Sequence, residues 1–239
     1  MTSQTSRLTR VGVTQPVLLP WVGLWNKVLA CDVYVVYAAV QYAHGDYFNR
    51  VTLNGSWLTV PVAKGATGGL IKDTRLADGY RHALAKLAAT LRQTCMPRSA
   101  KFRDRLGPIV TVLESWSSPW LMELTNELFL TMLDALEPPT RPRIVVDTTE
   151  RPLERLAKLD ACLRHHAGDA AFVYLCGAGG RAYMGHDSLA RPAETWFQQV
   201  KDGVPADTAL QLIATHARPL DVIARCAVWV DKDGQPHAQ

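Results

Sequence analysis

The stretch TRVGVTQPVLLPWVGLWNKVLACDVYVVYAAVQY, residues 9–42, decides the fold that the sequence predicts. It opens on a short apolar segment, turns through Pro16 and Pro20, and continues with apolar residues at helical spacing. The run that follows, DVYVVYAAVQY, is β-branched, aromatic and almost continuously apolar, which is typical of a strand covered on both faces. A strand, a short helix and a second strand within about 35 residues predict a βαβ unit.

Short strands are predicted in the next part of the chain. Asn54-Gly55 lies between RVTL and SWLTVPV, and this is the pattern of a β-hairpin with a type I′ turn. The segment IKDTRLAD, residues 71–78, could add one more strand.

Further along, the periodicity becomes helical. Residues 80–140 contain three helical segments, and the last is expected to begin with Ser118 as N-cap and Pro119 at its first position. RPRIVVDTT and AAFVYLCGAGG then have the composition of strands on either side of the helix RPLERLAKLDACLRHHAG. We therefore predict one α/β domain over residues 1–239. It has a Rossmann-like, mostly parallel sheet, a β-hairpin and a helical insertion or subdomain at residues 80–140.

Composition argues against several classes of protein. The chain has 239 residues, of which 48% are hydrophobic and 20% charged, and this balance favours a folded core over disorder. A net charge of +4 without a polybasic run predicts no nucleic-acid partner. No run of about 18 apolar residues occurs, so no membrane span is expected. Five scattered cysteines and a polar N-terminus predict reduced thiols in the cytoplasm, and a homodimer stays open.

The first candidate site follows the opening strand. Gln15 stands at the carboxyl end of that strand, where open α/β sheets bind ligands, and its amide can donate and accept hydrogen bonds. Pro16 and Pro20 would fix the turn, and the helix that follows, with Trp21 near its start, would present free N–H groups. The alternative is a rigid turn with Trp21 packed in the core, and both interpretations stay open.

A second group of polar residues follows the strongest predicted strand. The polar residues of QYAHGDYFNR are Gln41, His44, Asp46, Asn49 and Arg50. His44 and Asp46 could transfer protons, and Arg50 could hold a carboxylate or phosphate with two hydrogen bonds. The alternative for each residue taken singly is a solvated polar loop.

A glycine loop forms the third candidate. CGAGGRAYM, residues 176–184, follows a predicted strand, and Gly179 and Gly180 would let the backbone approach a ligand closely. Arg181 adds a positive charge beside them. The segment is neither a G-x-G-x-x-G fingerprint nor a Walker motif, and a tight turn or hairpin is the alternative.

No metal or cofactor is predicted. His165 and His166 are adjacent, so on a helix they point about 100° apart and cannot easily share one ion. The sequence has no H-x-x-x-H, no H-E-x-x-H, no Cys/His cluster and no G-x-S-x-G elbow. Cys176 lies beside the glycine loop, where a buried and inert thiol is the expected role.

Taken together, these stretches resemble the WbqC-like family. The positions that match its N-terminal pattern are Gln15, Pro16, Leu19, Pro20, Trp21, Gly23, Lys27, Asp32, Gln41, Tyr42, Asn49, Arg50, Leu58, Val60 and Pro61. A looser match runs through His82, Asn126, Gly177, Gly179, Gly180, Arg181, Tyr183, Leu220 and Asp221. The resemblance covers nearly the whole chain, and its N-terminal block is the specific part.

Some positions depart from the family pattern. Thr14 stands where many members have His, and Leu18 stands where many have Tyr. Ala38 and Ala39 replace an acidic pair. If those groups act in catalysis, this chain has lost them or has changed its substrate.

The resemblance implies a biosynthetic setting, such as surface-polysaccharide, O-antigen or natural-product assembly. The first hypothesis is a transferase that moves an acyl or aminoacyl group, from a carrier-protein or coenzyme A thioester, onto an amine of a sugar or other small molecule. One alternative is a non-catalytic protein that binds a ligand or carrier protein, and another is an enzyme that handles a nucleotide or nucleotide-sugar. The catalytic candidates are His44 and Asp46. The predicted substrate-binding residues are Gln15, Trp21, Gln41, Asn49, Arg50, His82, Asn126, Gly179, Gly180, Arg181 and Tyr183.

Overall fold

The computed structural model describes residues 7–95, 100–184, 189 and 192–237. Within them, the main sheet has seven strands in the order β5-β2-β1-β6-β7-β8-β9. The strands are β1 (Thr9–Thr14), β2 (Val33–Tyr37), β5 (Arg143–Asp147), β6 (Phe172–Cys176), β7 (Glu194–Val200), β8 (Ala227–Val230) and β9 (Pro236–His237). The first five strands in this order are parallel, whereas the β7–β8 and β8–β9 pairings are antiparallel. The predicted Rossmann-like, mostly parallel sheet is therefore confirmed.

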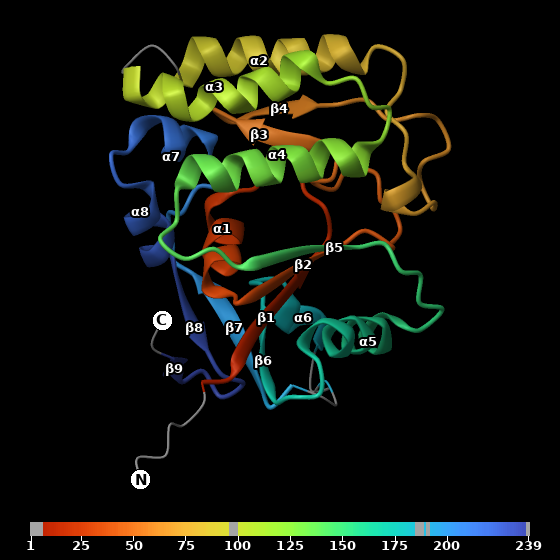
Figure 1. Cartoon of the computed structure of the whole chain (residues 1–239), viewed down its shortest axis with the longest axis vertical. Helices are drawn as coiled ribbons and strands as arrows, with labels where there is room; N and C mark the ends of the chain where they lie inside the picture. Colours follow the sequence, from red (N-terminus) through yellow and green to blue (C-terminus); the bar gives the residue numbers. More distant parts are fainter. Residues whose placement is uncertain (1–6, 96–99, 185–188, 190–191, 238–239) are drawn as a thin grey trace.

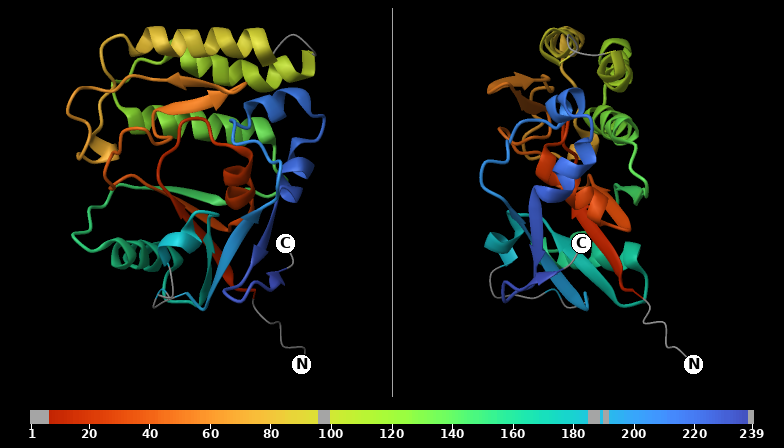
Figure 2. Two further views of the ribbon diagram at one scale, coloured as in Figure 1. Left: turned by 180° about the vertical axis from the view of Figure 1, so that it is seen from behind. Right: turned by 90° about the vertical axis from the view of Figure 1, so that its left-hand side faces the viewer.

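Helices cover both faces of this sheet, and a helical lobe stands at one end. The helices are α1 (Val22–Ala30), α2 (Tyr80–Cys95), α3 (Ala100–Ser115), α4 (Leu121–Leu136), α5 (Arg155–Ala167), α6 (Gly180–Met184), α7 (Leu210–Thr215) and α8 (Pro219–Arg225). A separate hairpin pairs β3 (Arg50–Leu53) with β4 (Ser56–Thr59). Figures 1 and 2 show α2, α3 and the hairpin at one end of the molecule, with the sheet, α5 and α6 at the other. Among the described residues, no helix has the length and apolar character needed to cross a bilayer.

Strand alternation produces two cores, one on each face. In β6, Phe172, Tyr174 and Cys176 belong to the core under α5 and α6, whereas Val173 and Leu175 belong to the core under α1. Side chains along a strand point alternately to opposite faces, so a nearly continuous apolar run serves both cores. This accounts for the sequence character that predicted a doubly covered strand.

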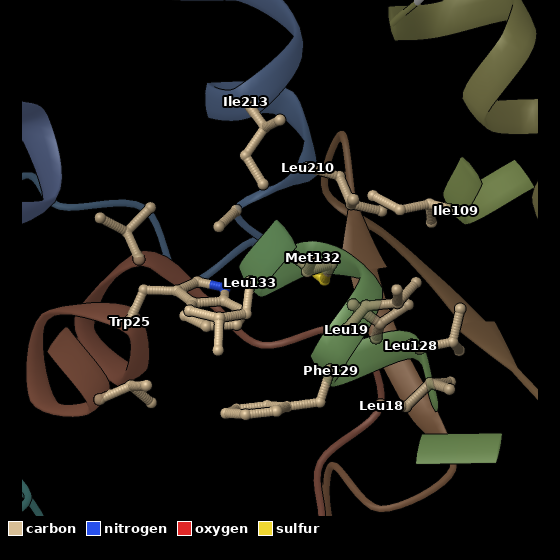
Figure 3. Close-up of a cluster of buried hydrophobic side chains, with 14 of the residues drawn as sticks. Leu18, Leu19, Trp25, Ile109, Leu128, Phe129, Met132, Leu133, Leu210 and Ile213 are labelled. Carbon is tan, nitrogen blue, oxygen red and sulfur yellow. The ribbon is translucent and has the colours of Figure 1, made fainter. Parts of the chain in front are cut away.

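The helical lobe is tied to the sheet through α4. Its buried residues follow helical spacing and are Leu121, Leu124, Thr125, Leu128, Phe129, Met132, Leu133 and Leu136. The Phe129 ring stacks on Trp25 of α1, with centroids 4.9 Å apart (Figure 3). It also stacks on Tyr34 of β2, with centroids 5.6 Å apart. Lobe and sheet therefore share one continuous core.

Local structure differs from the sequence-based expectation at three places. The last lobe helix begins at Leu121, because the Pro119 carbonyl accepts a hydrogen bond from the Leu76 amide and keeps that segment extended. Residues 71–73 form a 3₁₀ turn instead of a strand. Strands β8 and β9 were not predicted. The type I′ turn is confirmed, since Asn54 and Gly55 have φ values of 51° and 71°.

Truncating the ring that joins lobe and sheet should destabilise the whole chain. We expect Phe129→Ala to lower the free energy of unfolding by about 3–5 kcal/mol, because it leaves a cavity between Trp25 and Tyr34. Urea unfolding followed by tryptophan fluorescence and by circular dichroism should give one shared transition. Leu153→Ala, at an exposed position, is the control and should change stability by less than about 0.5 kcal/mol. Two separate transitions would contradict the shared core.

Candidate functional site

The carboxyl edge between β1 and β6 is the topological switch point of the sheet. β1 pairs with β2 on one side and with β6 on the other, and the chain leaves these strands toward opposite faces. Gly12 is paired with Leu175, so Gln15 and Gly177 follow from neighbouring strands at the same edge. Open α/β sheets bind ligands at such an edge. The structure thus brings together the N-terminal block and the glycine loop, two of the three predicted segments.

The turn between β1 and α1 is held by contacts on several sides. Leu19 has a φ of 52°, a conformation that a leucine rarely adopts, and its side chain is fully buried. The Leu18 amide donates to the Tyr47 carbonyl at 2.9 Å, and the Pro20 carbonyl accepts from the Ala209 amide at 2.9 Å. The motif P-W-V-G therefore ends a turn that the tertiary structure keeps in a strained conformation.

Gly23 in this motif makes room for Trp21. A Cβ placed on Gly23 would lie 2.3 Å from the Trp21 ring, so any side chain there would displace the ring. Trp21 is half-buried at the start of α1 and pairs with Thr208 through a β-bridge. Its position fits the packing interpretation of the turn.

Gln15 and Asn126, two predicted binding residues, line one small cavity. Gln15 is exposed after β1, and Asn126 reaches the same space from α4. The cavity is about 10 Å³ in volume, enough for one water molecule. The Asn126 Oδ1 atom is buried and has no hydrogen-bond partner among the described residues. Thr14, at the cavity wall, hydrogen-bonds the Tyr34 hydroxyl.

Lys27 also belongs to this edge, although the sequence analysis named it only as a position of the family pattern and not as a site residue. It lies on α1, is 2% exposed, and its Nζ donates to the Val13 carbonyl of β1 at 2.8 Å. Helical side chains tilt toward the N-terminus of their helix, and this tilt directs Lys27 toward the carboxyl edge of the sheet. A lone lysine inside the apolar segment WVGLWNKVLAC is the sequence signal that could have identified it.

The Lys27 amine lies beneath the glycine loop. A Cβ on Gly177 would be 3.9 Å from Nζ, and the centre of the Tyr174 ring is 5.7 Å away. No carboxylate forms an ion pair with Lys27 in the part of the chain that the structure describes. Burial away from water lowers the pKa of Lys27 below its ordinary value of 10.5.

The predicted residues at positions 41–49 lie between β2 and β3 in a loop that contacts the turn after Gln15 through Tyr47, and Arg50 is the first residue of β3. His44 and Asp46 are exposed, and the Asp46 carboxylate accepts the Tyr47 amide. The Arg50 guanidinium lies over the Trp57 ring at 4.1 Å, at the base of the hairpin. Gln41 is exposed and bridges to Leu70.

Asn49 is occupied by the fold itself. Its side chain is buried, accepts a hydrogen bond from the Tyr42 hydroxyl at 2.8 Å, and donates to the Val60 carbonyl at 2.7 Å. Both ends of the amide are therefore used to fix the loop against the segment after β4.

The remaining predicted residues are spread over different elements. His82 is exposed on α2 in the lobe. Gly179 is exposed and Gly180 is buried, and the Gly180 amide donates to the Gly177 carbonyl in a tight turn. Arg181 turns toward the β7–β8 side, where it donates to the Asp231 carbonyl at 3.0 Å. Tyr183 belongs to α6, and its side chain lies outside the described part of the structure.

A second polar cluster surrounds Asp147 at the end of β5. Its carboxylate accepts hydrogen bonds from Arg151 at 2.8 Å, from the Thr149 amide at 2.8 Å and from His166 Nε2 at 2.8 Å. Burial opposes ionisation of Asp147, but these hydrogen bonds outweigh it and hold its pKa well below the usual range. The group ties α5 to the edge strand.

Asp147, Cys162 and His166 are also the described residues that could hold a metal. Their ligand atoms lie within 4.8 Å of one another, and Cys162 and His166 are four residues apart on α5. The sequence analysis expected no Cys/His cluster, and the structure corrects this, because the C-x-x-x-H spacing on α5 brings Cys162 and His166 together beside Asp147. The Arg151 guanidinium already neutralises the carboxylate, so we interpret the cluster as a structural ion pair. The expectation of no metal stays a prediction.

A larger cavity of about 610 Å³ lies beside α7 and α8. The start of α1 and residues 201–208 complete its wall. Its size is in the range of small-molecule sites. Residues 201–205 of its wall follow directly after β7.

The fold and the edge between β1 and β6 define a doubly wound, Rossmann-like α/β protein with a candidate ligand site at its switch point. Residues 15–202 match the model of the WbqC-like protein family, and the chain belongs to that family. It is also 31% identical over 108 residues to the uncharacterized protein Rv1507c of Mycobacterium tuberculosis. That match spans 43% of this chain and 46% of the relative, less than half of either. No solved structure matches the chain significantly.

Replacing the buried amine by an isosteric apolar group should stabilise the protein. Because burial lowers the pKa of Lys27, the unfolded chain binds this proton more tightly, and wild-type stability rises with pH between the lowered pKa and 10.5. We expect Lys27→Met to unfold with a larger free energy than wild type at pH 6. The excess should shrink toward pH 9 by at most about 1.4 kcal/mol per pH unit. Urea titrations of both proteins at four pH values measure this difference in unfolding free energy.

Lys232→Met removes an exposed lysine and is the matched control, for which no such pH-dependent difference is expected. A Lys27→Met protein less stable than wild type at every pH would show that the amine serves the fold instead.

Breaking the Asp147 cluster should destabilise the protein, in contrast to replacing Lys27 by methionine. Asp147→Asn leaves Arg151 without its partner, and we expect a loss of about 3 kcal/mol of unfolding free energy at pH 7. The pKa of Asp147 is lowered by folding, so its contribution is present above 3.8 and is lost as the pH falls below that value. The difference between variant and wild type should therefore narrow at pH 3. Equal stabilities at pH 7, as expected for exposed Asp169→Asn, would contradict this.

Proposed function

We propose that the protein is a biosynthetic transferase that forms an amide, moving an acyl or aminoacyl group from a thioester onto a small-molecule amine. One observation carries the proposal: the switch point gathers Gln15, the glycine loop and the uncompensated amine of Lys27 at one edge. Family membership over residues 15–202 supports a shared function for these motifs. The open glycine backbone suits the phosphate-bearing arm of a thioester donor.

The roles of the residues follow from their places. Gln15 is exposed beside the edge and Asn126 Oδ1 has no partner among the described residues, so these amides can orient a donor carbonyl or an acceptor amine. His44 is exposed in the loop that contacts the Gln15 turn, and it remains the candidate base for the acceptor ammonium. Transfer requires the neutral amine to attack the thioester carbonyl, with the thiolate as leaving group and the amine proton passed to the base.

Blocking the loop should stop transfer without unfolding the protein. A Cβ on Gly179 meets no atom within 4 Å and its backbone is unstrained, so Gly179→Val should keep the wild-type melting temperature. We expect it to slow amide formation on the order of a hundredfold, because the donor can no longer approach the backbone. Mass spectrometry of product, from a panel of coenzyme A and carrier-protein thioesters with amino sugars, measures the rate. Gly107→Ala on α3, equally free of contacts, is the control.

Transfer by Gly179→Val at the wild-type rate would place the reaction elsewhere. Absence of product with every pair, together with a stable carrier-protein complex, would favour the non-catalytic alternative instead.

A second candidate is supported by the strand order. β1 at the centre of five parallel strands, with the switch point at its carboxyl end, is the arrangement that binds nucleotides in Rossmann folds. A nucleotide-sugar could then be the acceptor or the sole substrate. Thermal stabilisation by nucleotide-sugars, and not by other anions, would favour this alternative.

A further inference from the structure

The fold makes a passage for the side chain of Lys27. Gly12 of β1 faces α1, and a Cβ there would lie 2.5 Å from Cys31 Sγ and 3.2 Å from Lys27 Cε. Strand interiors disfavour glycine, which brings no side chain to pack. At this position the missing side chain lets the lysine stem run along the strand to the edge of the sheet. The passage is therefore specific to a long, thin side chain.

At the end of the passage, the amine has more donors than partners. The Lys27 ammonium has three N–H groups, and one of them is used by the Val13 carbonyl. The Tyr174 ring, at 5.7 Å, offers only a weak cation–π contact. In contrast, the buried carboxylate of Asp147 is held by Arg151, Thr149 and His166. The chain thus compensates its buried acid and leaves its buried base without a counter-charge among the described residues.

A structural explanation does not account for this arrangement. A buried charge without a partner costs free energy, and a methionine would fill the same space with no such cost. The single hydrogen bond to Val13 contributes less than burial of an amine costs. A ligand that supplies the missing negative charge would account for a lysine at this position.

The surroundings of the amine indicate where that ligand would lie. Gly177 covers Nζ without a side chain, and the next two residues, Ala178 and Gly179, are exposed. Backbone amides in a loop of small residues can approach an anion closely. Loop and amine stand at the carboxyl edge of parallel strands, where ligands of open sheets bind.

We propose that Lys27 is the anion receptor of the switch-point site, and that it binds a phosphate or carboxylate group of the substrate between its Nζ and the glycine loop at residues 177–179. This proposal rests on the proposed function, because it concerns the same site and names the group of the substrate that the site binds. The ion pair between the Lys27 ammonium and the anion would replace the hydration that burial removes from this charge. Residues of the glycine loop add backbone hydrogen bonds.

Calorimetric titration of the full chain with pyrophosphate, orthophosphate and malonate tests this at pH 7 and low salt. We expect wild type to bind at least one of them saturably at millimolar concentration. Comparison of the phosphate titrations with the malonate titration shows whether the site binds a phosphate or a carboxylate group. Lys27→Met and Lys27→Gln should each lose affinity by about tenfold or more, with melting temperatures not below wild type. Lys232→Met, which also removes one positive charge, should bind as wild type does.

Hydrogen–deuterium exchange of wild type gives a second readout that needs no variant. Bound anion should slow exchange in peptides covering residues 22–30 and 176–180. Failure of all three anions to bind, or equal binding by wild type and both Lys27 variants, would overturn the proposal. Anion binding that depends on Lys27 without any transfer product would support it and reject the transferase. Transfer product without anion binding that depends on Lys27 would support the transferase and reject the anion-receptor proposal.

Discussion

The parallel pairing of β1 with both β2 and β6 is the constraint on which the structure depends. It places β1 at the centre of the parallel strands and sends the chain to opposite faces on its two sides. Both cores are built on β1 and its neighbours, and the edge left open between β1 and β6 is the candidate site. The strained turn at Leu19 follows from the same constraint, because the chain must leave β1 and enter α1 within a few residues.

The helical lobe serves this edge as a wall. Phe129 of α4 lies between Trp25 and Tyr34, so the lobe is fixed to α1 and β2 by a stack of three rings. The same helix carries Asn126 to the small cavity next to Gln15. A helix about 110 residues downstream in the chain thus completes surroundings that begin with the N-terminal block. Because lobe and sheet share one core, the position of Asn126 depends on the packing of Phe129.

The two buried ionic groups have different consequences. Asp147 has partners on every side and joins α5 to the edge strand, so it contributes to the fold. Lys27 has a passage, one hydrogen bond and no carboxylate partner among the described residues, and it lies at the edge where ligands bind. Natural proteins tolerate such uncompensated groups mainly at functional sites, where stability is given up for binding or chemistry. Ala38 and Ala39 are both buried just after β2, so neither position supplies a carboxylate near Lys27.

The sequence by itself determined the α/β class, the hairpin turn and the helical lobe. It also showed that the N-terminal block and the glycine loop belong to one family pattern. These depend on local periods, on Asn54-Gly55 and on short motifs that are visible along the chain. The start of α4 was misplaced because Pro119 is held extended by Leu76, a contact from another segment.

Only the tertiary structure decided which strands meet, and therefore that Gln15 and Gly177 share an edge whereas Arg181 turns away from it. It also decided the burial of Lys27. A lysine's charge state and role depend on what surrounds its amine, and those surroundings come from β1, α1 and β6 together.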